Sequence, residues 1–244
     1  MELITDAFEK AKKSENIEKI NDFLIKLGEN PKEDYLIYLD YFFNETKEAM
    51  FEKIKLNIVY VLGEIGSETK IADNYLQKLL EIYYISDQWV RNEIIQTIKK
   101  ISRKTKLNEN IIELLGNSLN DDYLPVKLSA LEVLLHFKFI PKSILRKFFQ
   151  VLNSKESEIR DRCRRVLNKV PLETQGIFES LNFSENYKVL KPRAIRSLLL
   201  IKFRALFNLE SFREQIFNSG WDNSFKETFL KEIDIFQRIL IKNM

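Results

Sequence analysis

The chain has 244 residues, of which 45% are hydrophobic, so it can bury a sizeable core. Only six Gly and five Pro occur, and so few turn residues argue against a β-sandwich or barrel and favour an all-α chain. The net charge of +3 excludes neither acidic nor neutral partners, whereas the single cysteine, Cys163, excludes an intramolecular disulfide and a Cys-x-x-Cys site.

Residues 1–33 are predicted to form two helices, 2–13 and 15–28, that serve as an N-terminal cap. In the second helix, apolar residues recur at helical spacing, and Gly28 followed by Pro31 is typical of a helix end. The start lacks the basic and apolar regions of a signal peptide, and no run of about eighteen apolar residues occurs along the chain. We therefore expect a soluble, cytoplasmic protein without a transmembrane segment.

A pair of helices is then predicted five times over residues 34–205. The expected pairs are 35–43 with 50–65, 71–84 with 87–102, 108–119 with 125–137, 141–152 with 157–170, and 172–181 with 189–205. Gly66 and Pro171 are expected to end the second helices of the first and fourth pairs. Residues 206–244 are predicted to add a C-terminal cap of two helices, 209–218 and 222–242.

The second helices of these pairs align without gaps on an apolar residue followed by a basic one. The aligned dipeptides are Ile54-Lys55, Val90-Arg91, Val126-Lys127, Ile159-Arg160 and Leu190-Lys191, at spacings of 36, 36, 33 and 31 residues. Such a period, with one helical hairpin per unit, is typical of an α-solenoid, in which each hairpin buries its apolar face against its neighbours. We predict one all-α domain over residues 1–244, a right-handed superhelix of about five hairpins between two helical caps.

Two stretches at the start of second helices resemble a known family. Asp87-Gln88-Trp89-Val90-Arg91 and Asp122-Tyr123-Leu124-Pro125-Val126-Lys127 look like HEAT repeats, especially the short HEAT-like units of microbial proteins, and the resemblance covers about residues 34–205. In that family the turn Asp and the helix Arg or Lys commonly form a ladder between neighbouring units. The resemblance implies this structural role for Asp87, Arg91, Asp122 and Lys127. A looser match, Glu156-Ser157-Glu158-Ile159-Arg160, places Arg160 at the same position. HEAT-like arrays serve as adaptors, scaffolds, enzyme regulators and occasionally nucleic-acid enzymes, so the resemblance indicates a fold better than a function.

One segment is strongly basic. Residues 141–205 contain 15 Lys and Arg against 6 Asp and Glu, and many of these cations crowd the second helices of the fourth and fifth pairs. Second helices of a solenoid lie side by side, so we predict a positive patch that contacts a partner. Its proposed residues are Arg160, Arg164, Arg165, Arg193 and Arg196. An acidic protein segment, nucleic-acid phosphates or anionic lipid would suit this patch. The alternative is a solvated face that also pairs with the acidic first fifty residues of another copy of the chain.

Signatures of an enzyme are sparse. His136 is the only histidine, so a two-histidine metal site is excluded, and the residue is expected at a helix end without a catalytic part. Cys163 occupies a small apolar position and is expected to be buried. Trp89 and Glu93 lie one helical turn apart, and by type they are similar to the aromatic and carboxylate of HEAT-like DNA-alkylation-repair glycosylases. Trp89 is nevertheless expected to pack against the previous hairpin.

The sequence therefore favours a non-catalytic scaffold or adaptor that binds a protein partner with an acidic surface on its concave side. No metal and no cofactor are expected. The alternative is a nucleic-acid-binding HEAT-like protein, resembling the glycosylases named above.

Overall fold

The structure is a computed structural model that describes residues 4–14, 16–137, 140–169, 174–203 and 206–242. All regular secondary structure in these ranges is helical, which confirms the predicted all-α class. Contacts divide the chain into two compact units, Met1–Leu114 and Leu115–Met244, and the boundary falls inside α7 (Glu109–Ser118). The single domain expected over residues 1–244 and the hand of a superhelix stay predictions.

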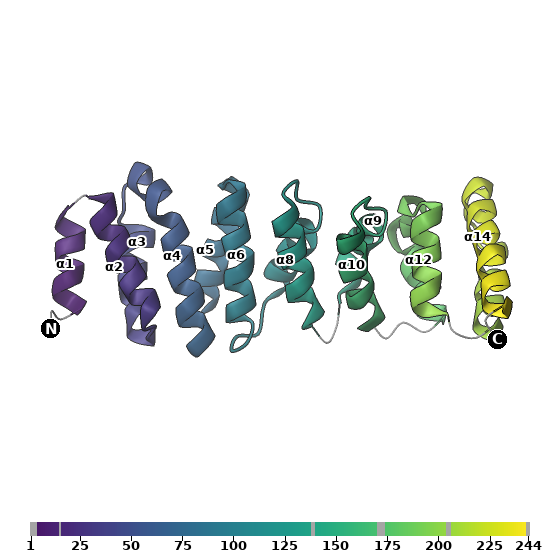
Figure 1. Cartoon of the computed structure of the whole chain (residues 1–244), viewed down its shortest axis with the longest axis horizontal. Coiled ribbons are helices and arrows are strands. Elements are labelled where there is room, and N and C mark those ends of the chain that lie inside the picture. Colours follow the sequence, from purple (N-terminus) through teal and green to yellow (C-terminus); the bar gives the residue numbers. More distant parts are fainter. Residues whose placement is uncertain (1–3, 15, 138–139, 170–173, 204–205, 243–244) are drawn as a thin grey trace. The chain divides into compact units, whose positions relative to one another are not determined.

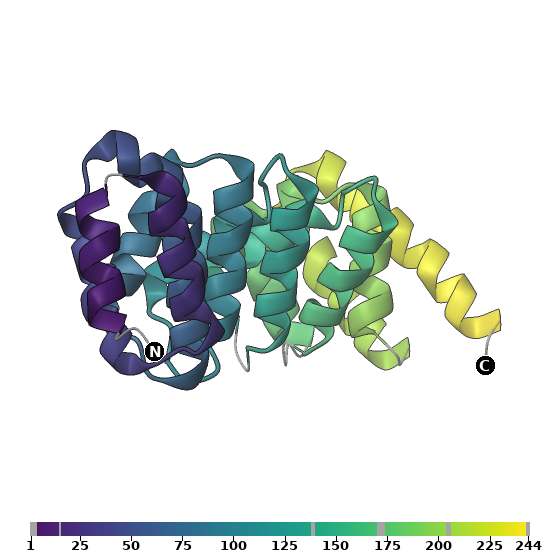
Figure 2. The same ribbon diagram turned by 60° about the vertical axis from the view of Figure 1, so that its left-hand side comes forward.

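Unit 1 consists of helical hairpins whose second helices pack side by side. The first helices are α1 (Ile4–Ser14), α3 (Leu36–Asn44), which follows the short 3₁₀ helix η1 (Glu33–Tyr35), and α5 (Asp73–Ile85). The second helices are α2 (Ile17–Glu29), α4 (Glu48–Glu68) and α6 (Gln88–Ile101). Helix α4 packs against both α2 and α6 (Figure 1), and α1 packs against α2 as a further hairpin (Figure 2). The predicted cap helices thus continue the pattern of the repeats.

Close helix packing explains a misplaced helix end in unit 1. Gly66 was expected to terminate the helix at residue 65, but α4 continues to Glu68. A Cβ atom on Gly66 would lie 2.4 Å from Cγ1 of Ile101 in α6, so glycine is needed here for the approach of the two helices. Gly63 has the same role, since a Cβ atom there would lie 2.7 Å from Oγ1 of Thr97.

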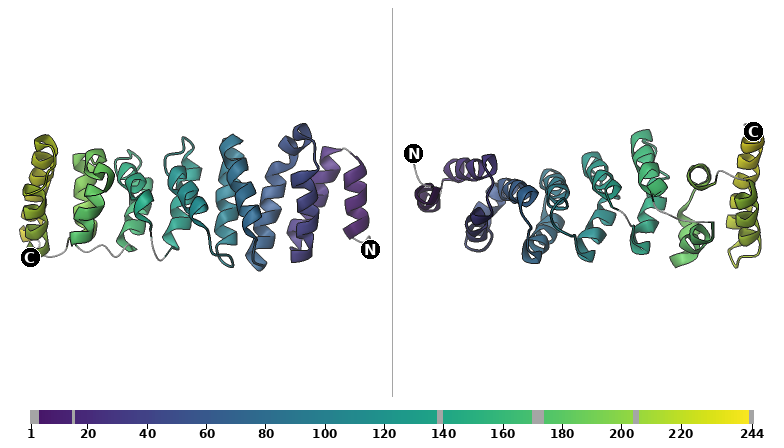
Figure 3. Two further views of the ribbon diagram at one scale, coloured as in Figure 1. Left: turned by 180° about the vertical axis from the view of Figure 1, so that it is seen from behind. Right: turned by 90° about the horizontal axis from the view of Figure 1, so that it is seen from below.

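Unit 2 repeats the arrangement with another set of hairpins. Its first helices are α9 (Lys142–Val151), α11 (Thr174–Asn182) and α13 (Leu206–Phe217). Its second helices are α8 (Leu124–Leu135), α10 (Ser157–Lys169), α12 (Pro192–Lys202) and α14 (Asn223–Lys242). Helix α10 packs against α8 and α12, and α12 packs against α14, as Figures 1 and 3 show.

The fifth pair departs from the prediction. A helix was expected from residue 189, but the chain forms a 3₁₀ segment, η2 (Phe183–Val189), and α12 begins only at Pro192. Ser184 and Glu185 have positive φ values of 49° and 52°, which interrupts the helical path. Proline lacks an N–H group and therefore fits the first turn of a helix. Leu190-Lys191 therefore precedes α12, whereas the other four dipeptides lie inside their helices, although Leu190, Ala194 and Ser197 are buried as Ile159, Cys163 and Val166 are.

The expected helix ends at Val170, Pro171, Leu172 and Ala205 lie outside the described residues. At the C-terminus, α13 and α14 confirm the predicted final pair, and they pack against each other.

Candidate functional site

The periodicity of α10 and α12 separates their apolar residues from their basic residues. In α10, Ile159, Cys163 and Val166 are buried at helical spacing, and Cys163 is fully inaccessible. In α12, the residues buried at helical spacing are Ala194, Ile195, Leu198 and Leu199. Apart from the buried Arg160, the arginines of both helices consequently lie toward the remaining surface. The five arginines of the predicted patch nevertheless differ in their surroundings.

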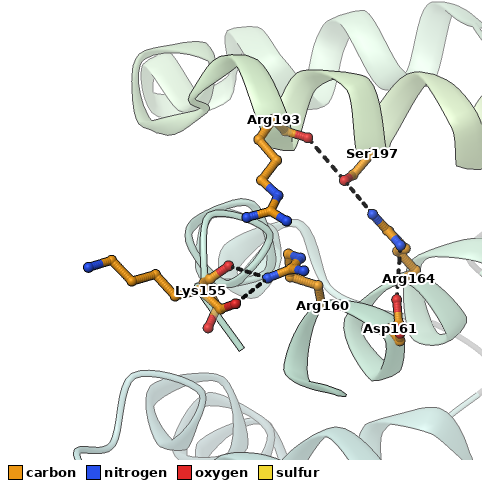
Figure 4. A network of polar contacts seen from close by, with 7 residues as sticks. Lys155, Arg160, Asp161, Arg164, Arg193 and Ser197 are labelled. Atoms are coloured by element: carbon orange, nitrogen blue, oxygen red, sulfur yellow. Dashed lines mark hydrogen bonds and ion pairs between the residues drawn. The ribbon is translucent and has the colours of Figure 1, made fainter. Parts of the chain in front are cut away.

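Arg160 is a buried residue that holds the turn before its own helix. Its side chain is only 7% exposed, and its Nη1 donates hydrogen bonds to the carbonyl oxygens of Ser154 at 2.8 Å and Lys155 at 2.6 Å (Figure 4). Arg91, the equivalent residue in α6, likewise donates from Nη1 to the carbonyl oxygen of Ser86 at 2.9 Å. The repeated basic residue therefore fastens the inter-helix turn, and most of the Arg160 side chain is buried.

Arg164 and Arg196 connect neighbouring second helices. Arg164 pairs with Asp161 at 2.9 Å and donates to Oγ of Ser197 in α12, also at 2.9 Å. Arg196 forms an ion pair with Glu232 of α14, and the side chain of Glu232 is only 6% exposed. The Nε atom of Arg196 lies 2.7 Å from Oε2 of Glu232, but the two groups are not aligned for a hydrogen bond. Both arginines thus have acidic partners within unit 2, and their charges are largely compensated.

Arg165 and Arg193 are exposed, and neither forms an ion pair with any residue in the described ranges. The exposed Lys155, Lys169 and Lys191 also lie on these helices or in the turns before them. We call this group of five the basic face: Lys155, Arg165, Lys169, Lys191 and Arg193. Arg165 and Arg193 are thus the two exposed members of the predicted patch that have no acidic partner among the described residues.

A shallow groove of about 210 Å³ adjoins Arg165 between α8 and α10. Leu131 and Leu135 form its apolar part, while Glu132 and Arg162 supply opposite charges. Arg162 is paired with Glu158 at 2.8 Å. Of the two arginines that line this groove, Arg165 is therefore the one that has no acidic partner among the described residues.

The residues of the predicted ladder lie at the starts of second helices. Asp87 caps α6, because its Oδ1 accepts hydrogen bonds from the backbone N–H groups of Trp89 and Val90. Ahead of α8 it is Asp121, not the exposed Asp122, whose Oδ1 accepts a backbone hydrogen bond, from Tyr123. A ladder between units stays a prediction for Asp87, Arg91 and Asp122.

Lys127 has an acidic counterpart in the next hairpin. A hydrogen bond from Ser154 is the main cause that lowers the pKa of Glu156, and the positive charge of Lys127 contributes to the same shift. Glu156 stands in the turn before α10, so the charge of Lys127 in one hairpin acts on the turn carboxylate of the next. The sequence prediction included Lys127 but missed Glu156.

Several partners that the sequence analysis missed share one signal, a separation close to one repeat length. Arg196 and Glu232 are 36 positions apart, as are Glu64 and Lys100, which pair at 2.7 Å. The side chains of Asn21 and Asn57 are hydrogen-bonded at the same separation. Pairing complementary residues one period apart would have found these contacts.

Trp89 and Glu93 do not share one environment. Trp89 is 61% exposed, so most of its surface remains open to solvent, and its packing against the previous hairpin stays a prediction. Burial raises the pKa of Glu93, and the neighbouring Lys100 partly opposes this shift. The Nζ of Lys100 is itself paired with Glu64 and lies 4.8 Å from the ring centroid of Tyr60. Glu93 is thus the neighbour of a structural ion pair between α4 and α6.

The two single-copy residues lie where the sequence predicted. Cys163 is buried, burial raises the pKa of its thiol, and its Sγ contacts the carbonyl oxygen of Phe148 at 3.5 Å. His136 is the exposed C-cap of α8, and its Nδ1 lies 2.9 Å from the carbonyl oxygen of Glu132. The described residues contain no cluster of His, Cys, Asp and Glu able to hold a metal. Nor does any helix in those ranges have the length and apolar character needed to cross a membrane.

No family model and no curated protein matches the chain. Solved structures do match. A computationally designed armadillo repeat protein for modular peptide recognition aligns with a TM-score of 0.50 at 14% identity, covering 96% of this chain and 99% of the designed one. An engineered protein of the Northeast Structural Genomics Consortium gives a TM-score of 0.54 at 14% identity, covering 95% of this chain and 68% of its own. Another from the same consortium gives 0.52 at 15% identity, covering 96% of this chain and 99% of its own.

At such low identity the likeness shows the fold alone. The chain is an all-α, armadillo-like helical-repeat solenoid.

Proposed function

We propose that this protein is a non-catalytic scaffold that binds an acidic polypeptide segment on its basic face. One observation carries the proposal. Arg165 and Arg193 are exposed on neighbouring second helices, and neither has an acidic partner among the described residues, although the other arginines there are paired or buried. Uncompensated cations at one surface attract negatively charged partners and accelerate their association.

The architecture supports a binding role. Stacked hairpins offer a pre-formed surface, so the scaffold loses little conformational entropy when a partner binds. The structurally similar designed armadillo protein is described as made for peptide recognition, and we extend binding of a polypeptide from that protein to this chain as a proposal. Assignment to the HEAT-like class belongs to the same proposal, supported by the two-helix units such as α9 with α10. A cytoplasmic location of the protein is also part of this proposal.

The direct experiment measures the fluorescence anisotropy of a labelled, capped hexaglutamate peptide titrated with the protein. We expect the double charge reversal Arg165→Glu with Arg193→Glu to abolish binding. The matched control reverses two exposed lysines of unit 1, Lys26→Glu with Lys70→Glu, and changes the net charge equally. Equal loss in both variants would show that only the net charge matters and would refute a localised binding surface.

The nucleic-acid alternative is tested in the same format. A single-stranded oligonucleotide whose affinity falls steeply with salt and exceeds that of the peptide would replace the acidic polypeptide as the ligand class. The glycosylase alternative predicts release of modified bases that Glu93→Gln abolishes. A scaffold predicts no such release.

A further inference from the structure

We propose that Arg160, Arg193 and the N-terminus of α12 form a binding site for one carboxylate group of the acidic partner. The inference rests on the proposed function and specifies where on the basic face a single side-chain carboxylate docks. It depends on three observations: a buried cation that lacks an acid, a second cation directed toward it, and the place of both in the repeat.

Arg160 supplies a cation held in one position. Arg160 is only 7% exposed, and its Nη1 donates hydrogen bonds to the two carbonyl oxygens of the 154–155 turn. Its Nε is inaccessible and has no hydrogen-bond partner, and Arg160 forms no ion pair with the described residues. A buried charge without a counter-charge is unfavourable, so the folded protein gains if an anion approaches this guanidinium.

Arg193 supplies a second cation that is directed toward the first. Figure 4 shows its side chain extending from α12 toward the guanidinium of Arg160, with Asp161 on the far side against Arg164. Arg193 is exposed and unpaired within the described part of the chain, so solvent and ligands reach it. Two guanidinium groups that face each other repel, and a carboxylate between them would turn that repulsion into two attractions.

The preceding hairpin of unit 2 offers a comparison. There the positive charge of Lys127 contributes to the lowered pKa of Glu156, the carboxylate in the turn of the next hairpin. Arg160 is the equivalent residue of its hairpin, but the next hairpin presents Lys191 and Arg193 instead of an acid. Lys191 thus stands where Glu156 stands in the preceding turn, and the partner's carboxylate would supply the acid that is absent there.

The start of α12 adds to the attraction. Its N-cap residue, Lys191, provides no side-chain cap, and the backbone N–H of Lys191 is bonded to Oδ1 of Asn153. Cations are unfavourable at the positive end of a helix dipole, whereas anions are favourable there. Two basic residues at that end, with no acid in the first turn, suit a carboxylate from another molecule.

The test records side-chain Nε–H NMR signals of arginine-labelled protein during titration with capped hexaglutamate, and in parallel with inorganic sulfate. Saturating shifts at both Arg160 and Arg193 are expected with each ligand. Arg193→Gln should weaken hexaglutamate binding about tenfold, because it removes a charge-assisted contact. Arg165→Gln, which removes the same charge from the same face, should weaken it only about twofold. Arg193→Lys should fall between them, since it keeps the charge but loses the planar fork.

The outcomes separate the two proposals. Equal, small losses for Arg193→Gln and Arg165→Gln would overturn the site and leave the proposed function standing. Absence of sulfate shifts at Arg160 and Arg193 would also overturn the site, whatever the peptide does. Saturating sulfate shifts without any peptide binding would overturn the proposed function and the carboxylate as ligand. Arg160 itself is left unchanged, because its replacement would disturb the 154–155 turn, and circular dichroism confirms that each variant is folded.

Discussion

Replacement of Gly63 by alanine tests the close packing of second helices on which the fold depends. The new Cβ atom would lie 2.7 Å from Oγ1 of Thr97, 3.2 Å from its Cα and 3.3 Å from Cδ of Lys100. Thr97 is fully buried, and its hydroxyl donates a 2.9 Å hydrogen bond to the carbonyl oxygen of Val59. The methyl group therefore either pushes α4 and α6 apart or displaces the threonine hydroxyl from its bond.

The magnitude follows from three contributions. Overpacking of a well-filled helix contact costs about 1–3 kcal/mol, and a displaced, buried hydroxyl costs about 1–3 kcal/mol. Alanine offsets about 1 kcal/mol of this, because it is the better residue inside a helix. We expect Gly63→Ala to lower the free energy of unfolding by about 3 kcal/mol, the middle of the range that these contributions span.

The assay is urea unfolding followed by circular dichroism at 222 nm, with Gly220→Ala as the control. A Cβ atom on Gly220 would have no atom within 4 Å, and Gly220 has no positive φ, so its replacement should change stability by less than about 0.5 kcal/mol. In a Thr97→Ala background, which removes the nearest contact, Gly63→Ala should be clearly less harmful. If Gly63→Ala is as stable as the unmodified protein, α4 and α6 do not approach as closely as described.

Three further predictions follow from single residues. Arg196→Gln should lower the free energy of unfolding by about 2 kcal/mol, because Glu232 is left buried without its cation. The control Arg193→Gln should change the free energy of unfolding little. Equal effects of the two variants in urea unfolding would contradict this prediction. Burial lowers the pKa of Lys202 to about 8. Since an unfolded lysine titrates near ~10.4, the folded state binds fewer protons between these values, so stability due to Lys202 rises with pH there. Lys202→Met should flatten the rise of unfolding free energy between pH 7.5 and 9.5, and an unchanged slope would refute the assignment. Cys163, buried and with a raised pKa, should resist a thiol reagent in the native protein and react at once in urea; rapid native labelling would show that α10 is more open than described.

The helical repeat was predictable because its local signals agree. Asp87 before α6 and Pro125 at the start of α8 mark helix starts by capping and by proline geometry, and the buried Val90, Val126 and Ile159 recur at helical spacing. The errors have tertiary causes. Gly66 resembles a helix stop in sequence, but the glycine is required by Ile101 of the neighbouring helix. The fifth pair was shifted because an apolar-basic dipeptide at residue 190 looked like the repeat, while Pro192 determines where α12 begins.

The basic segment was predictable as a concentration of charge, but the role of each arginine was not. Arg160 and Arg193 look alike in sequence, yet one is buried against backbone carbonyls and the other is exposed. Composition counts charges, whereas the free charge depends on acidic neighbours such as Glu232, which belongs to another hairpin. Only three-dimensional packing shows which arginines are buried, which are paired and which are exposed without an acidic partner.

Cross-linking of the acidic peptide to nearby lysines measures directly where it binds. A carbodiimide joins a bound hexaglutamate carboxylate to adjacent amines, and mass spectrometry identifies them. Binding to the basic face predicts cross-links at Lys155, Lys169 and Lys191, which are exposed on α10 or beside it and before α12. Lys26 and Lys70 of unit 1 should remain unmodified, and Arg193→Glu should remove the cross-links in unit 2. Cross-links spread over exposed lysines of both units, unchanged by Arg193→Glu, would contradict the proposal.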